Sequence, residues 1–404
     1  MASINKLKLG ILAMVIGLNP AKAFAAPAAT VIDGKYQIET LATLDHPWSI
    51  AALPDGRLLL TEKPGRLRMF ADGKLSEPIS GMPAVAYREQ GGLLAVAVDP
   101  AFAENKYIYL SFAQAAEQQP TDAKETIDKR LGENQKVDDV TLKGLAVARA
   151  RLDDGKLNDL TVIWQQVPKT IGRGYFGGQL AFAKDGTLMI TSGDRQQFEP
   201  AQDLMSNIGK IVRINSDGSL PSGNAFPDRQ DARGDIWSFG HRNPLGILLD
   251  RATDTLWSHE MGPKGGDEVN LIKQGANYGW PKTSEGVHYN DAAIPKHATD
   301  RDINRPALAW VPAISPAGFA MYTGDAFPAW RGKALIGGLS AKALVVVSLD
   351  AANNKAVEVE RITMDRRIRD VMVADDGTLY LIGDAPDGAL LKMTPVKAER
   401  GASN

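Results

Sequence analysis

Cysteine is absent from this chain of 404 residues. Without cysteine, the protein cannot form disulfide bonds, thiolate metal sites or a cysteine nucleophile. Its stability must therefore come from burial of an apolar core, together with any metal that binds through other ligands.

A concentrated block of positive charge is also missing. The chain has 46 Lys and Arg residues against 48 Asp and Glu residues. Proteins that bind nucleic acids present clustered basic residues to the phosphate backbone. The sequence therefore predicts no nucleic-acid partner.

Several common catalytic motifs do not occur. There is no Gly-x-Ser-x-Gly elbow, Walker loop, His-Glu-x-x-His pair or dinucleotide fingerprint, and the five His residues are scattered at positions 46, 241, 259, 288 and 297. Nicotinamide chemistry and zinc chemistry are therefore not favoured.

Long apolar runs are missing beyond the N-terminus. Lys6 and Lys8 precede an apolar run over residues 9–18, and Ala23-Phe24-Ala25 gives the small-x-small pattern that signal peptidase cuts. A short membrane anchor is the alternative, but a spanning helix needs about 20 apolar residues. We predict a signal peptide over residues 1–25, no stable membrane insertion and a periplasmic or secreted protein.

A sequence pattern recurs through the rest of the chain. Each copy has a turn with Asp-Gly or a similar pair, followed by a strand of alternating apolar residues. The six copies are residues 54–61, 99–111, 184–191, 251–257, 332–337 and 375–381. They predict an all-β fold, one six-bladed β-propeller over residues 26–404 with long loops on the ligand-binding face. A pair of β-sandwiches is the alternative, and the polar insert at 121–143 is interpreted as a surface loop.

Two arginine-containing segments predict an anion site. Arg242 and Asn243 lie in a loop bounded by Gly and Pro, and Arg367 and Arg369 alternate along a strand, so both would point to one side. Guanidinium groups bind carboxylates in a bidentate manner, so a ligand with several carboxylates would fit. The alternative is local salt bridges to Asp370 or Asp365.

A glycine-rich run at residues 260–268, followed by 277–280, concentrates carboxylates and backbone carbonyls. Oxygen ligands of this kind favour calcium, although the acidic spacing of an EF-hand is missing. A tight structural turn is the alternative interpretation.

Taken together, these segments resemble the soluble aldose and glucose dehydrogenases that use pyrroloquinoline quinone (PQQ) with calcium on a six-bladed propeller. The segments that carry the resemblance are 46–50, 90–94, 193–195, 209–211, 240–246, 262–263 with 267–268, and 367–371. They span the chain in order, so the resemblance covers the whole mature protein.

The resemblance implies site residues. The quinone carboxylates would be held by residues matching Arg242, Asn243, Arg367 and Arg369, with Gln90 beside the reactive end. The calcium linked to the cofactor would take backbone oxygens of Gly262 and Pro263. A second, structural calcium would lie near Glu268 and Tyr278.

The chain departs from the family pattern at the reactive end. In the family, a His takes the proton from the anomeric hydroxyl while hydride passes to the quinone. Tyr175 stands in place of that His, Gln179 in place of a nearby Arg, and Ser340 in place of a Lys. From these matching positions, Gln179 and Ser340 are also expected to bind the cofactor. A phenol has an ordinary pKa of about 10 and is a poor base at neutral pH, unless cationic neighbours such as Arg173 or calcium lower it.

The resemblance predicts a quinoprotein dehydrogenase that oxidises an aldose or related sugar and passes electrons to an exported acceptor. Its catalytic residues would be Tyr175, Gln90 and Arg242. Two alternatives remain open: a quinone-binding or sugar-binding propeller without the redox reaction, and a calcium-dependent propeller lactonase. The loops at 283–299 and 312–327 contain no sequence pattern that identifies the sugar. Trp330, Trp280 and Tyr322 suit either a carbohydrate cleft or the core.

Overall fold

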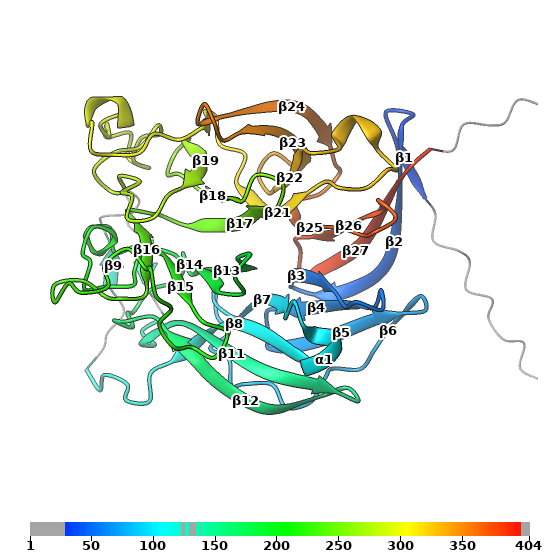
Figure 1. The fold of residues 1–404 in the computed structure, drawn as a ribbon, viewed down its shortest axis with the longest axis horizontal. Helices are drawn as coiled ribbons and strands as arrows, with labels where there is room; N and C mark the ends of the chain where they lie inside the picture. Colours follow the sequence, from blue (N-terminus) through cyan, green and yellow to red (C-terminus); the bar gives the residue numbers. More distant parts are fainter. Residues whose placement is uncertain (1–28, 123–125, 129–134, 138, 397–404) are drawn as a thin grey trace, which may run out of the picture.

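The computed structural model describes residues 29–122, 126–128, 135–137 and 139–396. The predicted signal peptide lies outside these residues. Six β-sheets surround a central axis as the blades of a propeller (Figure 1), which confirms the predicted fold. Within the described residues, no helix is long and apolar enough to cross a membrane.

Three blades come from the first half of the chain. Blade 1 contains β3 (Pro47–Ala52), β4 (Leu58–Glu62), β5 (Arg66–Ala71) and β6 (Lys74–Leu75). Blade 2 contains β7 (Leu93–Val98), β8 (Tyr107–Ala115), β11 (Lys143–Asp153) and β12 (Lys156–Gln165). Blade 3 contains β13 (Gly177–Phe182), β14 (Leu188–Ser192), β15 (Lys210–Ile214) and β16 (Ile236–Phe239).

The other three blades complete the ring. Blade 4 contains β17 (Pro244–Asp250), β18 (Thr255–Glu260), β19 (Asp267–Ile272) and β20 (Leu308–Trp310). Blade 5 contains β21 (Pro316–Met321), β22 (Ala334–Gly338), β23 (Ala343–Asp350) and β24 (Lys355–Thr363). Blade 6 contains β25 (Ile368–Val373), β26 (Leu379–Gly383), β27 (Asp387–Pro395), β2 (Tyr36–Asp45) and β1 (Thr30–Ile32).

Each predicted repeat forms the hairpin between the first two strands of one blade. Gly56, Gly186 and Gly377 in three of these turns have φ angles of 85°, 81° and 80°. This conformation is unfavourable for residues with a Cβ, so the Asp-Gly pairs favour the hairpins at which the strands reverse.

Blade 6 closes the ring with strands from both ends of the chain. β2 pairs antiparallel with β27, from Tyr36 opposite Pro395 to Asp45 opposite Asp387. Figure 1 shows the blue β2 beside the red β27. The first strand of every blade also contacts the first strand of the next, so the inner ring is continuous.

Six apolar clusters fill the spaces between successive blades. Leu59 of β4 and Ile108 of β8 meet between blades 1 and 2, and Trp257 of β18 meets Ile336 of β22 between blades 4 and 5. All four are fully buried. Burial of each such side chain stabilises the fold by about 1.5–3 kcal/mol, so the stability of a blade depends on its neighbours.

The large aromatic residues Tyr322 and Trp330 belong to the cluster between blades 5 and 6. Their relative exposures are 0% and 3%. They are core residues and do not line a carbohydrate cleft.

The interpretation of residues 121–143 as a surface loop is wrong in part. Short strands β9 (Thr126–Asp128) and β10 (Gln135–Val137) pair there as a hairpin. Lys143 already belongs to β11, and its buried ammonium forms an ion pair with Asp139. The end of the polar segment is thus fixed to the propeller by a buried charge pair.

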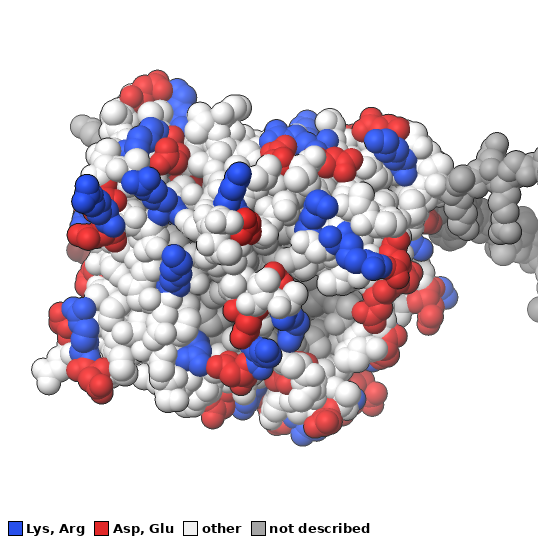
Figure 2. Space-filling model, turned by 45° about the horizontal axis from the view of Figure 1, so that its top comes forward, with Lys and Arg blue, Asp and Glu red and all other residues white. Residues whose placement is uncertain are grey.

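Charges of both signs are interspersed over the described surface that faces the viewer in Figure 2. This distribution agrees with the near-balance of charge in the sequence, where the formal net charge is -2.

Candidate functional site

The predicted reactive residues lie in the segments that lead into the first strand of a blade. Gln90 precedes β7, Tyr175 precedes β13, Arg242 precedes β17 and Arg367 precedes β25. Because the first strands form the inner ring, these segments meet at one end of the central axis. Residues that are far apart in the sequence are brought together there.

The segments enclose a cavity of about 230 Å³. Four of the predicted cofactor-binding residues line it: Gln90, Asn243, Arg367 and Arg369. The remaining lining residues are Trp48, Lys63, Leu94, Phe176, Gly177, Leu245, Met261, Ser315 and Leu339. A larger cavity, of about 850 Å³, lies around Pro54 and contains none of the predicted residues. The smaller cavity is therefore the candidate site.

Tyr175 and Arg242 form a buried pair beside this cavity. Nη2 of Arg242 donates a hydrogen bond to the phenolic oxygen of Tyr175 at 2.7 Å, and the guanidinium carbon lies 4.4 Å from the centre of the phenol ring. Oε1 of Gln90 accepts a hydrogen bond from the backbone nitrogen of Tyr175 at 3.0 Å. The structure thus brings together all three predicted catalytic residues.

The backbone of Tyr175 is strained. Its φ angle is 53°, a conformation that costs a bulky residue about 1–3 kcal/mol. The fully buried Arg195 holds this segment by donating to the carbonyl oxygens of Gly174, Gly172 and Lys143 at 2.9–3.0 Å. The surrounding structure therefore forces the phenol toward Arg242.

Burial raises the pKa of the Tyr175 phenol to about 12, although the positive charge of Arg242 acts in the opposite direction. The loss of solvation outweighs the positive charge of Arg242, so this neighbouring guanidinium does not bring the pKa of Tyr175 toward neutrality. An effect of Arg173 or calcium stays a prediction. At neutral pH Tyr175 is a neutral phenol that can both donate and accept a hydrogen bond.

Arg242 is enclosed by aromatic rings. Besides Tyr175, its guanidinium carbon lies 5.2 Å from the Trp280 ring and 5.9 Å from the Tyr289 ring. Nε1 of Trp280 donates to the buried carboxylate of Asp194 at 2.7 Å. Trp280 therefore fixes the cation and the carboxylate in place, and its relative exposure is 5%.

Arg367 directly precedes β25 and Arg369 lies within it. Both bind Asp384, which shows that the two side chains point to the same side, as the alternation predicts. Arg367 Nε lies 2.6 Å from Oδ2 of Asp384, and Arg369 Nη2 lies 2.8 Å from Oδ1. The alternative partners Asp365 and Asp370 are wrong. Asp365 pairs with Arg366, and Asp370 accepts backbone N–H groups.

Asn243, Gln179 and Ser340 have different surroundings. Oδ1 of Asn243 accepts a hydrogen bond from the nitrogen of Gly177 at 3.3 Å, at the wall of the cavity. Gln179 lies within β13, and Ser340 is exposed, with Oγ donating to the oxygen of Ala313 at 3.3 Å. The structure does not place Gln179 and Ser340 among the lining residues, and their cofactor role stays a prediction.

The loop between β18 and β19 brings carbonyl oxygens close together. A Cβ atom on Gly262 would lie 2.3 Å from the oxygen of Gly266, so only glycine fits there. Nη1 of Arg242 donates to the oxygens of Met261 and Gly262 at 2.9 and 2.5 Å. Gly262 thus presents its oxygen toward Arg242, and Pro263 follows in the same loop. Backbone oxygens of this kind are suitable ligands for calcium.

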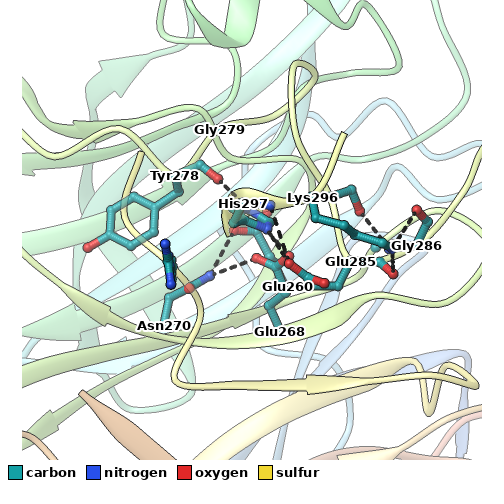
Figure 3. Close-up of polar contacts among 12 residues, drawn as sticks. Glu260, Glu268, Asn270, Tyr278, Gly279, Glu285, Gly286, Lys296 and His297 are labelled. Atoms are coloured by element: carbon teal, nitrogen blue, oxygen red, sulfur yellow. Dashed lines mark hydrogen bonds and ion pairs between the residues drawn. The ribbon is translucent and has the colours of Figure 1, made fainter. Parts of the chain in front are cut away.

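A buried acidic cluster lies behind this loop (Figure 3). Nδ2 of Asn270 lies 3.3 Å from both Oε1 of Glu260 and Oε2 of Glu268, and Nε2 of His297 lies 3.6 Å from Oε1 of Glu268. Burial, together with the Glu260 carboxylate, raises the pKa of Glu268 well above its usual range. Two buried carboxylates repel each other unless a proton or a cation joins them.

The predicted ligand Tyr278 can contribute only its main-chain oxygen to this cluster. Its phenol donates to the oxygen of Leu271 at 2.6 Å and points away, whereas its carbonyl oxygen lies 3.2 Å from Nε2 of His297 (Figure 3). No group of three or more His, Cys, Asp or Glu side chains in the described parts of the chain could hold a metal ion. A cation here would therefore need backbone oxygens as well.

The sequence analysis did not identify Lys63, Asp384 and Tyr289. Asp384 follows β26 directly, and the pairing of Ile368 with Gly383 places it opposite Arg367. The antiparallel register of β25 and β26 could therefore have identified Asp384 as the partner of Arg367. Lys63 lies in the turn after β4, and Tyr289 lies in the long segment between β19 and β20, where no local pattern marks either residue.

Comparisons with known proteins agree with this geometry. The family model described as Glucose / Sorbosone dehydrogenase matches residues 44–392. Aldose sugar dehydrogenase YliI of Escherichia coli (strain K12) is 38% identical over 381 residues, which are 92% of this chain and 95% of that protein.

Two solved structures share the fold. The soluble aldose sugar dehydrogenase from Escherichia coli in the apo-form has a TM-score of 0.81 and 37% identity, and the match covers 89% of this chain and 100% of that chain. The PQQ-bound form of aldose sugar dehydrogenase from Streptomyces coelicolor has a TM-score of 0.68 and 23% identity, over 91% of this chain and 100% of that chain. The extent of these matches and the shared propeller lead to one conclusion: the chain belongs to the glucose/sorbosone dehydrogenase family.

Proposed function

We propose that this protein is a PQQ- and calcium-dependent dehydrogenase that oxidises an aldose or related sugar at C1 to the lactone or acid. The main support for this proposal is the charge of the residues that line the cavity. Lys63, Arg367 and Arg369 line the cavity, and among the described lining residues and their ion-pair partners Asp384 alone carries a negative charge. A cavity with this excess of positive charge suits a small ligand with several carboxylates.

The residues present fit both groups that the proposal requires. Nε of Arg242 is buried and lacks a hydrogen-bond partner among the described residues, so a polar atom of a ligand would satisfy it. Gly262 and Pro263 would hold one calcium through carbonyl oxygens. Glu268 and the carbonyl oxygen of Tyr278 would hold another, which would relieve the repulsion between Glu268 and Glu260.

The roles of the other residues follow from their positions. When bound, PQQ would supply the hydride acceptor and calcium would supply Lewis acidity at the reactive end. Arg367, Arg369 and Asn243 bind and orient the cofactor carboxylates. Gln90 holds the backbone of Tyr175, and Arg242 orients the phenol, which receives the proton of the anomeric hydroxyl.

Cofactor binding without turnover is the second candidate. It is supported by the raised pKa of Tyr175, which keeps the phenol protonated at neutral pH. The lactonase alternative has less support, since it gives Arg242, Arg367 and Arg369 no function. It also calls for a set of acidic ligands that the described residues do not supply.

The proposal also includes secretion of the protein. The pattern in residues 1–25 supports secretion to the periplasm or beyond, where an exported acceptor would take the electrons. N-terminal sequencing of the protein recovered from the producing cells tests this step, and a mature start near Ala26 is the expected result.

The test of function uses the mature protein with PQQ and calcium. Dye reduction is followed across a panel of aldoses, and cofactor binding is titrated in parallel by quenching of tryptophan fluorescence. Aldose-dependent reduction that chelation abolishes is the expected result. Tight PQQ binding without turnover would support the second candidate, and absence of PQQ binding would overturn the quinoprotein proposal.

A further inference from the structure

A second phenol lies on the outer side of the Tyr175–Arg242 pair. The hydroxyl of Tyr289 lies 3.4 Å from Nη2 of Arg242, the nitrogen that also donates to Tyr175 at 2.7 Å. Both phenolic oxygens therefore face the same guanidinium nitrogen, and Tyr289 is close enough to raise the pKa of Tyr175. The relative exposure of Tyr175 is 9%, whereas that of Tyr289 is 40%. Tyr289 therefore connects a buried hydroxyl to solvent.

The segment that carries Tyr289 is fixed to the glycine-rich loop. Lys264 and Val287 exchange two backbone hydrogen bonds of 3.0 and 3.2 Å. Nζ of Lys264 also pairs with Oδ1 of Asp291 at 2.6 Å. On the other side, the ring of His288 lies 6.2 Å from that of Phe198. These contacts flank Tyr289 and hold its hydroxyl near Arg242.

We propose that Tyr289 conducts the proton released during sugar oxidation from Tyr175 to solvent. This inference rests on the dehydrogenase function proposed above. Tyr289 contacts Arg242 beside Tyr175, and it acts through Tyr175. It is therefore a positioning and relay residue of the proton path.

The step balances as follows. The anomeric hydroxyl gives its proton to the phenolic oxygen of Tyr175, Tyr175 gives its own proton to the oxygen of Tyr289, and Tyr289 gives its own to water. The C1–H bond breaks with its electron pair, which goes to the quinone as hydride. The electron pair of the broken O–H bond becomes the second bond of the new C=O group. The sugar loses one hydride and one proton, and both phenols end in their starting state.

The relay accounts for catalysis by a phenol that is not ionised. A concerted transfer needs neither phenol to exist as a free phenolate before the sugar binds. Nη2 of Arg242 faces both oxygens and stabilises the negative charge that develops along the path. The carboxylate of Asp194 opposes ionisation of Tyr175, and a concerted path also reduces this cost.

The experiment compares Tyr289→Phe with Tyr87→Phe in the protein loaded with PQQ and calcium. Both residues are exposed tyrosines, at 40% and 42%, but Tyr87 packs against His46 and Lys63, away from the proton path. The measurements are kcat, its solvent deuterium isotope effect, rescue by imidazole, PQQ affinity and the melting temperature.

The expected result for Tyr289→Phe is a kcat at least tenfold lower, within the range of about 10²–10⁴-fold that proton transfer contributes. Its solvent isotope effect changes and imidazole restores part of the rate, while PQQ affinity and melting temperature stay unchanged. Tyr87→Phe behaves as the wild type.

Two results would overturn the relay. One is an unchanged kcat and isotope effect in Tyr289→Phe. The other is a loss of rate that accompanies weaker PQQ binding and does not respond to imidazole, which would show a structural role only. A wild-type protein that reduces no dye with any aldose would instead overturn the proposed function itself, before the variants are compared.

Discussion

The phenolic oxygen of Tyr175 and Nη2 of Arg242 are joined by a hydrogen bond of 2.7 Å. The resemblance to the family implies an imidazole, a much stronger neutral base, at the position of that phenol. Under the proposed function this pair is where the proton acceptor would differ, and substitutions of Tyr175 in both directions test it.

Tyr175→His is expected to raise kcat at neutral pH, because an imidazole with a pKa of about 6.5 accepts a proton far more readily than a phenol. Tyr175→Phe is expected to lower kcat by about 10² or more, with PQQ affinity unchanged. Steady-state dye reduction on the reconstituted proteins measures both effects. Equal rates in wild type and Tyr175→Phe would show that the phenol has no part in proton transfer.

The two cavity arginines give a prediction on cofactor affinity. Arg367→Gln and Arg369→Gln should each weaken PQQ binding at least tenfold, about 1.4 kcal/mol, because each removes a charge-assisted contact with a carboxylate. Arg366→Gln is the matched control, since Arg366 directly precedes Arg367 in the chain but pairs with Asp365. Fluorescence titration with PQQ measures the affinities. An equal loss of PQQ affinity in all three variants would show that the overall positive charge of this region, and not contacts inside the cavity, determines binding.

Removal of calcium should lower the melting temperature of the wild-type protein. The cause is the unrelieved repulsion between the buried carboxylates of Glu260 and Glu268. A ligand at 100 times its Kd stabilises the folded state by about 2.7 kcal/mol. In Glu268→Gln the difference between calcium and chelator should nearly disappear, whereas the exposed Glu104→Gln should retain it. Thermal unfolding followed by circular dichroism provides the comparison, and a wild-type protein indifferent to chelation would contradict the metal site.

Asp370 gives a prediction on pH. Burial raises the pKa of this carboxyl group to about 6, above its ordinary value of 3.8. Between these values the folded state binds more protons than the unfolded state, so stability falls as pH rises from about 4 to 6. The loss from this one group is at most about 3 kcal/mol.

Asp370→Asn should therefore flatten the pH dependence of the free energy of unfolding in this window, as measured by urea titration. The exposed Asp365→Asn serves as the control. The same slope in wild type and Asp370→Asn would show that the carboxyl group titrates normally.

The propeller could be predicted from the sequence because its signals are local. Turn residues, Asp-Gly in three of the six repeats, favour hairpins within a few residues. Six hairpins, each followed by an alternating strand, imply six blades. The common direction of Arg367 and Arg369 followed from the same period of two.

The site could be predicted only in part, because its remaining contacts depend on distant pairing. Asp384 reaches Arg367 through the register of β25 and β26, and neither Asp365 nor Asp370, although close in sequence, is the partner. The sequence could not show whether Tyr278 would offer a metal its carbonyl oxygen or its phenolic oxygen. The effect of burial on the pKa of Tyr175 could not be predicted without the position of its neighbours.

The pairing of β2 with β27 has a consequence for how the protein is made. β2 must wait until β27, the last strand of the described residues, has been synthesised, so the ring cannot close before then. Contacts of such large sequence separation also slow folding. Until β27 arrives, β2 and β26 are left with unpaired edges that other chains could extend. A chain of this design remains an open ring during its synthesis, and it becomes a closed ring only after its C-terminal strand is free to pair.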